Sequence, residues 1–361
     1  MKYFICEGKL EEKNKYNASN KPREDVEKIC TSNGYERLYV ESEYGVKQKK
    51  WQKPAQLITY LKNRNKWKTK LNELNEGDTI FFQYPLLNTT WNFHTILKKY
   101  NKKINIVVLV HDLDSLRYTR EISSERVLIR KRKEDKHVLN NANYIIAHNY
   151  SMKNELVKLG NDKNSIFELN LFDYLMDDKI RTIKRTKNDG VIIAGCLDKN
   201  KAKYLTFLNK IKGTKFNLYG VGYEPSKEDK NVCYKGKFLP EELLNNLDGG
   251  FGLVWDGISK DTCTGGFGNY LRYNNPHKAS MYLTAKIPII TWKNAAIAKF
   301  VEDNKVGITV DSLDEISDTI KKTSDKEYQE MVENTKKISE KTTKGKFLKE
   351  ALEKIEKAIQ K

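Results

Sequence analysis

Short apolar runs alternate with helix-like stretches along this 361-residue chain, and the alternation restricts the folds that it can adopt. The run at 104–110 (INIVVLV) is apolar throughout, as expected for a strand buried on both faces of a parallel sheet. Similar runs stand at 3–6, 144–147 and 190–194. Alternating strands and helices with few hairpin signals predict an α/β fold with a doubly wound parallel sheet.

The same patterns predict the remaining elements. Further strands are expected at 37–40, 78–83, 165–169, 215–219, 250–255, 287–291 and 307–310. Helices are expected at 23–33, 55–74, 91–100, 121–139, 151–160 with Ser151 as the cap, 201–210, 240–246 and 276–284.

The chain is longer than one hydrophobic core comfortably holds, which favours two domains. Residues 176–188 are polar and basic and sustain neither period, so we interpret them as a linker. The sequence therefore predicts two Rossmann-like domains facing each other across a cleft, at 1–178 and 179–340, with a C-terminal helix in 341–361 that crosses the junction.

The 66 basic and 48 acidic side chains give a formal net charge of +18, which favours an anionic partner. A solvated, lysine-rich surface is the first interpretation. A peripheral contact with an anionic membrane is the second. Nucleic-acid binding is the third, and it is disfavoured because aromatic and basic residues are not interleaved in an RNA-binding pattern.

The five cysteines are far apart and form no C-x-x-C pair, so neither a disulfide framework nor a zinc site is indicated. The N-terminal apolar run is too short for a signal peptide, and no window approaches 18 apolar residues. We expect a cytoplasmic, reduced protein that at most associates with the inner face of the membrane.

Three strand–loop–helix junctions in the second half are candidate anion sites: 195–199, 219–222 and 274–278. Parallel sheets bind ligands at the carboxyl ends of their strands, where helix N-termini present unpaired N–H groups.

The junction at 274–278 is the most informative of the three. Asn275 suits the N-cap, Pro276 the first helical position, and Lys278 lies in the first turn, where a cation opposes the helix dipole. A bound phosphate would account for the lysine, and a solvated lysine after an ordinary cap is the alternative. Arg272, in a Gly- and aromatic-rich loop typical of a flexible lid, could bind a phosphate or pair at the surface.

Several segments resemble one family of bacterial GT-B glycosyltransferases. They are YNASNKPRED (16–25), VVLVHDLDSLR (107–117), LVWDG (253–257), NYLRYNNPHK (269–278) and SMYLTAKIPII (280–290). The family is glucosyltransferase-3-like: it includes the second glucosyltransferase of serine-rich-repeat adhesin glycosylation and related β-1,6-galactofuranosyltransferases. The resemblance extends over most of the chain.

The resemblance implies a metal-independent transferase without a cofactor. It would move glucose, galactose or galactofuranose from a UDP-sugar, held by the C-terminal domain, to a glycan acceptor on lipid or protein, held by the N-terminal domain. The biological setting would be surface polysaccharide or adhesin glycosylation, and the assembly a homo-oligomer, either a dimer or a tetramer.

Carried over by motif, Lys278 would contact the diphosphate with help from Asn275, and Tyr219 would lie against the nucleotide. Lys199, in the loop after Gly195, falls where the family presents a basic residue to the phosphates. Asn17 and Ser19 match an N-terminal loop of the donor site in which the family usually has glycine at the position of Ser19.

The chemistry requires neutralisation of the departing diphosphate and a base for the acceptor hydroxyl. Asp112 and His111, at the end of the buried strand, are the candidate bases; a capping aspartate and a satisfied histidine are the alternatives. His277 is a further candidate for hydrogen bonding to the phosphates. The D-x-D triplet Asp112 to Asp114 is interpreted as a chance spacing, and no metal site is predicted.

The leading hypothesis is an inverting hexosyltransferase. The main alternative is a non-catalytic nucleotide-sugar-binding partner of another glycosyltransferase. The presence of both Lys278 and a carboxylate at Asp112 favours the enzyme.

Overall fold

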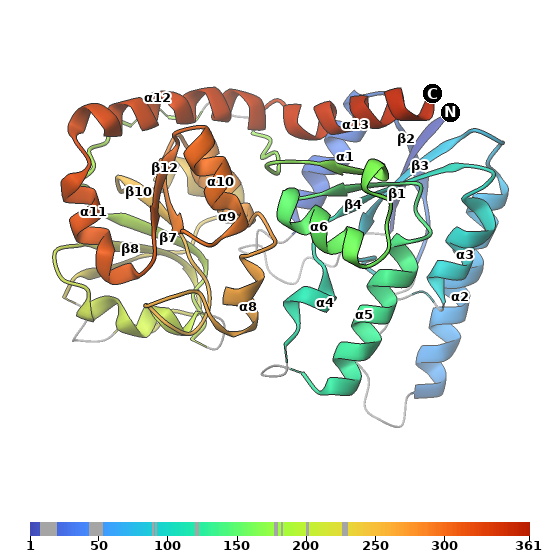
Figure 1. Cartoon of the computed structure of the whole chain (residues 1–361), viewed down its shortest axis with the longest axis horizontal. Coiled ribbons are helices and arrows are strands. Elements are labelled where there is room, and N and C mark those ends of the chain that lie inside the picture. Colours follow the sequence, from blue (N-terminus) through green and yellow to red (C-terminus); the bar gives the residue numbers. More distant parts are fainter. Residues whose placement is uncertain are drawn as a thin grey trace. The chain divides into compact units, whose positions relative to one another are not determined.

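The computed structural model describes residues 1–7, 20–42, 53–88, 90, 92–119, 123–176, 180–181, 183–199, 202–225 and 230–361. The chain folds into two compact units (Figure 1). The first contains the N-terminal strand, Val26–Leu169 and Lys349–Lys361. The second contains Asn170–Leu348 and a short segment that ends at Asp25.

The first unit is built on a six-stranded parallel sheet with the order β2-β1-β3-β4-β5-β6. Its strands are β1 (Lys2–Cys6), β2 (Glu36–Tyr39), β3 (Thr79–Tyr84), β4 (Asn105–Val110), β5 (Tyr144–Ala147) and β6 (Ile166–Glu168). Its helical segments are α1 (Lys21–Ser32, which begins in the second unit), α2 (Lys53–Asn72), α3 (Phe93–Tyr100), α4 (Asp114–Arg117), α5 (Glu125–Leu139), α6 (Tyr150–Lys158) and the 3-10 helix η2 (Lys163–Ser165).

The centre of this sheet is the pair β3 and β4, which runs in register from Thr79 opposite Asn105 to Tyr84 opposite Val110. All of β3 and all of β4 after Asn105 are buried, as expected for parallel strands covered on both faces. Trp67 of α2 packs edge-on against Phe82 of β3 and Phe93 of α3, with ring centroids 6.0 and 4.7 Å away. These rings fix α2 and α3 on the sheet.

The second unit has a matching parallel sheet with the order β12-β11-β10-β7-β8-β9. Its strands are β7 (Val191–Cys196), β8 (Phe216–Val221), β9 (Val232–Gly236), β10 (Phe251–Val254), β11 (Ile289–Trp292) and β12 (Gly307–Val310). Its helical segments are η3 (Lys203–Lys210), α7 (Pro240–Asn246), α8 (Gly265–Tyr270), α9 (His277–Thr284), α10 (Ala296–Asp303), η4 (Leu313–Glu315), α11 (Ile316–Lys322), α12 (Asp325–Thr342) and the start of α13 (Lys346–Ile359).

The long helix α12 is fixed at both ends. Ser324 and Glu327 form a capping box at its start. Near its end, Ser339 donates to the carbonyl of Thr284 at 2.7 Å, and the Thr342 and Thr284 hydroxyls lie 2.7 Å apart. These bonds join the C-terminal end of α9 to the C-terminal end of α12.

The observed fold confirms the predicted class, with two doubly wound α/β units in series. Two predicted capping residues were wrong. The N-cap of α6 is Asn149, whose side chain accepts from the Met152 N–H, and not Ser151. The N-cap of α9 is Pro276, which leaves Asn275 outside the helix. In both cases the sequence has more than one residue near the helix start that could cap it, and only the backbone geometry distinguishes them.

The unit boundary lies at Asn170 and α13 divides after Leu348, whereas the sequence suggested 178 and 341. The reason is local packing in the second unit: Leu171, Phe172 and Tyr174 are buried, and Asp173 accepts from the N–H groups of Phe347 and Leu348. The polar linker follows this buried segment. Among the described residues, every helix is too short or too polar to span a bilayer.

Candidate functional site

The strand ends of β7 and β8 in the second unit approach each other as closely as glycine allows. Gly195 and Gly220 have φ angles of 131° and 139°, and a Cβ on Gly220 would lie 1.8 Å from the Gly195 carbonyl oxygen. A cavity of about 250 Å³ opens beside this contact. Gly195 therefore shapes the site through its backbone.

The cavity lies wholly within residues of the second unit. It is lined by the ends of β7 and β8, the segment from Lys237 to Leu243, and α9, together with Pro22 and Tyr174. Four of the predicted site residues therefore line one space: Gly195, Tyr219, His277 and Lys278.

Tyr219 forms an aromatic wall of the cavity. The side chain is buried, its hydroxyl accepts from the Asp248 N–H at 2.9 Å, and its ring centroid lies 6.0 Å from that of Phe238. Burial raises the pKa of the Tyr219 hydroxyl, so it stays neutral. Two rings and the neighbouring Val221 can receive a flat, weakly polar group such as a nucleobase.

Lys278 lies in the first turn of α9, and its amine already has partners. The Nζ atom donates to the Trp255 carbonyl at 2.8 Å and pairs with Asp256 Oδ1 at 2.9 Å, with both side chains largely buried. The cation that opposes the helix dipole is therefore neutralised by a carboxylate in this structure. The sequence did not reveal this partner, which precedes Lys278 by 22 residues.

His277 and Asn275 support the start of α9 in different ways. The His277 ring packs on Phe172 with centroids 4.2 Å apart and lines the cavity. Asn275 is buried, donates through Nδ2 to the Asn170 carbonyl, and does not line the cavity. Its amide joins the helix start to the beginning of the unit.

Lys199 and Arg272 also lie outside the lining residues. The Lys199 amine pairs with Glu224 at 3.3 Å, and both side chains are exposed. The Arg272 guanidinium lies 4.4 Å above the Trp292 ring, at the surface. The Lys199 amine thus has a carboxylate partner, and the exposed Arg272 guanidinium lies on an aromatic ring.

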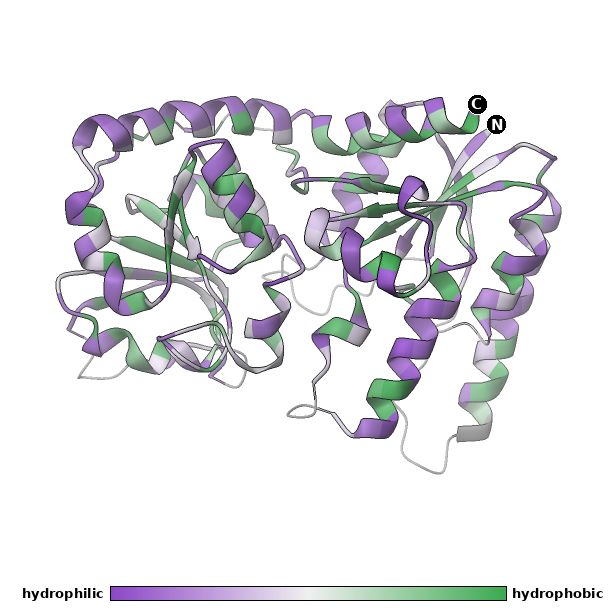
Figure 2. Ribbon diagram, viewed as in Figure 1, coloured by the Kyte–Doolittle hydropathy of each residue, from purple (hydrophilic) through white to green (hydrophobic). Residues whose placement is uncertain are grey.

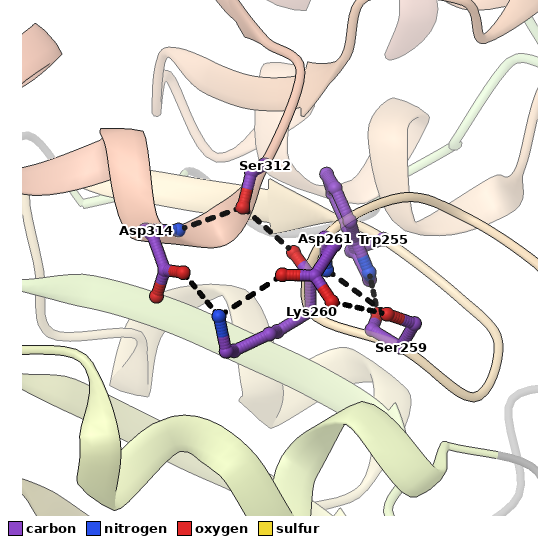
Figure 3. Close-up of polar contacts among 6 residues, drawn as sticks. All are labelled: Trp255, Ser259, Lys260, Asp261, Ser312 and Asp314. Atoms are coloured by element: carbon purple, nitrogen blue, oxygen red, sulfur yellow. Dashed lines mark hydrogen bonds and ion pairs between the residues drawn. The ribbon is translucent and has the colours of Figure 1, made fainter.

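The loop that carries Asp256 is tied down by polar contacts (Figure 3). Trp255 Nε1 donates to the Ser259 carbonyl at 3.0 Å, Lys260 pairs with Asp261 and Asp314, and Ser312 donates to the Lys260 carbonyl at 3.2 Å. These contacts anchor the loop after β10 to the turn after β12.

Part of the loop expected to be a flexible lid is the short helix α8. A Cβ on Gly268 would lie 2.7 Å from the Cys263 carbonyl carbon and 2.9 Å from the Asp256 carbonyl oxygen. This glycine therefore allows close packing against the Asp256 loop. In the sequence, glycines needed for close packing cannot be distinguished from glycines that make a loop flexible.

The candidate bases lie at the carboxyl end of β4 in the first unit. His111 Nε2 lies 2.6 Å from Gln83 Oε1, and Asp112 pairs with Arg117 at 2.7 Å. Asp114 pairs with Lys131 at 2.7 Å. The two carboxylates of the D-x-D triplet thus face different cations. Asn17 and Ser19 lie outside the described residues.

Sequence reasoning missed three buried ionisable groups near the same edge of the first sheet. Glu7 accepts from the N–H groups of Leu87 and Asn88 at 2.9 and 3.4 Å. Burial raises the pKa of Asp135 to about 6 and lowers that of His148 to about 4. His148 directly follows a predicted strand, and this position should have identified it as a candidate site residue.

Sequence analysis also failed to predict two residues that line the cavity, Lys237 and Phe238. They connect β9 to α7, and the strand–helix junction was not recognised because β9 was not predicted.

Two family models match the chain. The glucosyltransferase 3-like N-terminal domain matches residues 2–171, and the glucosyltransferase 3-like C-terminal domain matches residues 191–355. Beta-1,6-galactofuranosyltransferase WbbI of Escherichia coli (strain K12) is 35% identical over 300 residues, 80% of this chain and 82% of that protein. Glucosyltransferase 3 of Streptococcus gordonii is 27% identical over 282 residues, 76% of this chain and 78% of that protein.

Among solved structures, HepE of Anabaena in complex with UDP matches with a TM-score of 0.59 at 11% identity, covering 100% of both chains. At this identity the likeness concerns the fold alone.

Proposed function

Because this chain belongs to the glucosyltransferase 3-like family and has its two-domain GT-B fold, we propose that it is a UDP-sugar-dependent hexosyltransferase. Glycosyltransferase activity follows from the family, and the donor and acceptor are the proposal. The donor is a UDP-hexose with glucose, galactose or galactofuranose, and the acceptor is a glycan on lipid or protein.

One observation carries the assignment of the donor site: Lys278, at the start of α9, lines the same cavity as the Tyr219 wall. An aromatic surface for a base and an amine at a helix N-terminus for a phosphate are the two halves of a nucleotide site. The uracil would lie against Tyr219 and Phe238, and the diphosphate would lie near Lys278 and His277.

The proposed reaction is a single displacement with inversion. An acceptor hydroxyl attacks the anomeric carbon, the bond from that carbon to the diphosphate oxygen breaks, and UDP leaves with the electron pair. Lys278 and the α9 N–H groups offset the charge that develops on the leaving group, without a metal ion or another cofactor. Lys199, Arg272 and Asn275 would join only if donor binding moves them from their present partners.

The acceptor proton needs a base, and we assign this role to Asp112 or His111 of the first unit. Asp112 forms its ion pair with Arg117 at the carboxyl end of β4, and its carboxylate is partly exposed, so an acceptor hydroxyl could reach it. His111 is half-buried beside Gln83. A homo-oligomer, which the family resemblance implies, is also part of the proposal.

The first experiment compares thermal unfolding of the protein with UDP, UDP-glucose, UDP-galactose, UDP-galactofuranose and ADP. We expect the uridine nucleotides to raise Tm and ADP to raise it less, because ligands that bind only the folded state stabilise it. Equal shifts for ADP and UDP, or no shift with any nucleotide, would contradict the proposed donor.

The second experiment distinguishes the enzyme from a non-catalytic nucleotide-sugar-binding partner. UDP release is followed when the UDP-sugar that gave the largest Tm shift is mixed with a panel of lipid-linked and protein-linked glycans. We expect release that depends on an acceptor and is lost in Asp112→Asn if Asp112 is the base. Donor binding without release on any acceptor would favour the non-catalytic function.

A further inference from the structure

The helix α2 carries a strongly one-sided charge. Residues 53–72 contain no aspartate or glutamate, and the absence of acidic residues extends back to residue 44 in the sequence. The basic residues of α2 are Lys53, Lys62, Arg64, Lys66, Lys68 and Lys70. A helix with this composition attracts an anionic surface.

The two halves of α2 differ in burial. In the C-terminal half, Trp67 and Leu71 are fully buried on the first unit. In the N-terminal half, Leu57, Ile58 and Leu61 are 41%, 57% and 40% exposed. Since positions 57, 58 and 61 share one helix face, the exposed side chains form an apolar stripe that no described part of the protein covers well.

The helix α5 repeats this pattern. Ile129 is 52% exposed near its N-terminal end. Arg126, Arg130, Arg132 and Lys133 surround it in the sequence, and all four are exposed. In α5, acidic residues are fewer than basic ones. Glu125 and Glu134 are exposed, whereas Asp135 is buried against Tyr84.

The two exposed ends belong to one unit. The helix α3 contacts both α2 and α5, and Figure 1 shows the N-terminal ends of α2 and α5 extending past α3 in the same direction. In the ribbon of Figure 2, hydrophobic residues interrupt the hydrophilic ones in both helix ends. Single exposed apolar residues are ordinary, but here they occur together within basic surroundings.

We propose that the N-terminal halves of α2 and α5 form a docking surface for an anionic lipid bilayer. Lysine and arginine side chains would contact acidic headgroups, and Leu57, Ile58, Leu61 and Ile129 would enter the boundary between headgroups and acyl chains. This combination is typical of interfacial helices, in which both charge and buried apolar area contribute to binding.

Two other partners fit the surface less well. A nucleic acid would use the cations but offers little to exposed aliphatic side chains. A second copy of the chain, meeting this surface across a twofold axis, would place like charges against one another. The proposal therefore commits to lipid and leaves nucleic acid and self-association as outcomes of the test.

The experiment is co-sedimentation of the protein with vesicles, without nucleotide, so its result is independent of the proposed donor site. One set is phosphatidylcholine alone, and the other is phosphatidylcholine mixed with phosphatidylglycerol. We expect binding to the mixed vesicles that is at least tenfold tighter than binding to neutral vesicles and is weakened by salt.

Two variants distinguish the contributions. Ile58→Ser with Leu61→Ser removes apolar area, and Arg126→Gln with Arg130→Gln removes charge. All four residues are exposed, so folding should be retained. Each pair should weaken vesicle binding at least fivefold. Lys299→Gln with Lys336→Gln, on α10 and α12, is the charge-matched control and should bind as the wild type does.

Three results would overturn the proposal. They are equal binding to both vesicle types, equal loss in the control, and retained vesicle binding in the Ser variant. Tight binding to DNA that is lost in the Gln variant, together with no vesicle binding, would assign the surface to nucleic acid instead. A dimer that dissociates in the Ser variant would assign it to a second copy.

Discussion

At the scale of single residues, the ion pair between Lys278 and Asp256 controls the charge that a phosphate would meet. The lysine alone would attract an anion, but the carboxylate beside it repels one. Because the Trp255 carbonyl also holds the amine, Lys278 keeps a partner when the carboxylate is removed. In the proposed donor site, Asp256 would therefore weaken nucleotide binding, which would favour product release.

Asp256→Asn should tighten the binding of UDP by about three- to tenfold, because it removes a like charge but retains a hydrogen-bond acceptor. Binding of uridine, which lacks phosphates, should not change. Calorimetric titration of both ligands provides the measurement. If the two affinities fall together, Asp256 has a purely structural role.

Burial of Asp135 gives a second prediction at this scale. Its carboxylate accepts from the Tyr84 hydroxyl at 2.6 Å and from the Ser115 N–H at 2.8 Å, and burial raises its pKa to about 6. The folded protein therefore holds this proton more tightly than the unfolded chain. The resulting stabilisation is complete below about pH 4 and is lost as the pH rises through about 6.

Asp135→Asn should remove this pH-dependent part of the free energy of unfolding, which is on the order of 3 kcal/mol. The amide can still accept from the Ser115 N–H. Urea unfolding at several pH values across the window is the measurement, and Asp318→Asn, at an exposed carboxyl, is the control. Parallel pH profiles for the wild type and Asp135→Asn would refute the assignment.

At the scale of elements, the close contact between the ends of β7 and β8 forms one wall of the cavity. Gly220 has a φ of 139° and no room for a Cβ, which would lie 1.8 Å from a carbonyl oxygen. Gly34 also has a positive φ, 78°, but nothing lies within 4 Å of its Cβ position. Comparing alanine substitutions at these two glycines therefore distinguishes the cost of a steric clash from the cost of backbone strain alone.

Gly220→Ala should lower the free energy of unfolding by about 3 kcal/mol or more, because the strands must separate. Gly34→Ala should cost about 1 kcal/mol. Chemical unfolding of both variants tests the difference. Equal losses would mean that the strand ends can adjust, and the close contact would not be needed to form the cavity.

Among the described strands, the sequence predicted every one except the edge strand β9. The strands β3, β4, β7 and β10 have continuous buried cores that give strong apolar runs. The edge strand β9 is only half-buried, so its sequence VCYKG gives no such signal. Missing β9 also concealed Lys237 and Phe238 in the site.

At the scale of the whole molecule, the boundary between the units shows what composition cannot reveal. The polar stretch after residue 176 marks a change in composition, but the buried segment from Leu171 to Tyr174 already packs with the second unit.

The candidate site was predicted in part, since four of its residues meet in one cavity. The partners of Lys199, Arg272 and Asn275 are distant in the sequence, so their contacts could not be predicted from it.

The proposed chemistry divides between the two units, with donor binding in the second and the base in the first. Asp112→Asn should therefore leave UDP affinity unchanged and lower kcat by at least a hundredfold if Asp112 is the base. Initial rates of UDP release and calorimetry with UDP check both parts. A loss of affinity with unchanged kcat would exclude Asp112 as the base.

The most direct test of the account is calorimetric titration of UDP into the wild type, Lys278→Ala and the control Lys299→Ala, whose amine pairs with Asp303 at the surface. Lys278→Ala should weaken UDP binding at least tenfold, because a partly buried amine no longer contacts the diphosphate. Lys299→Ala should bind as the wild type does. Equal affinity in all three proteins would contradict the assignment of the donor site to the start of α9.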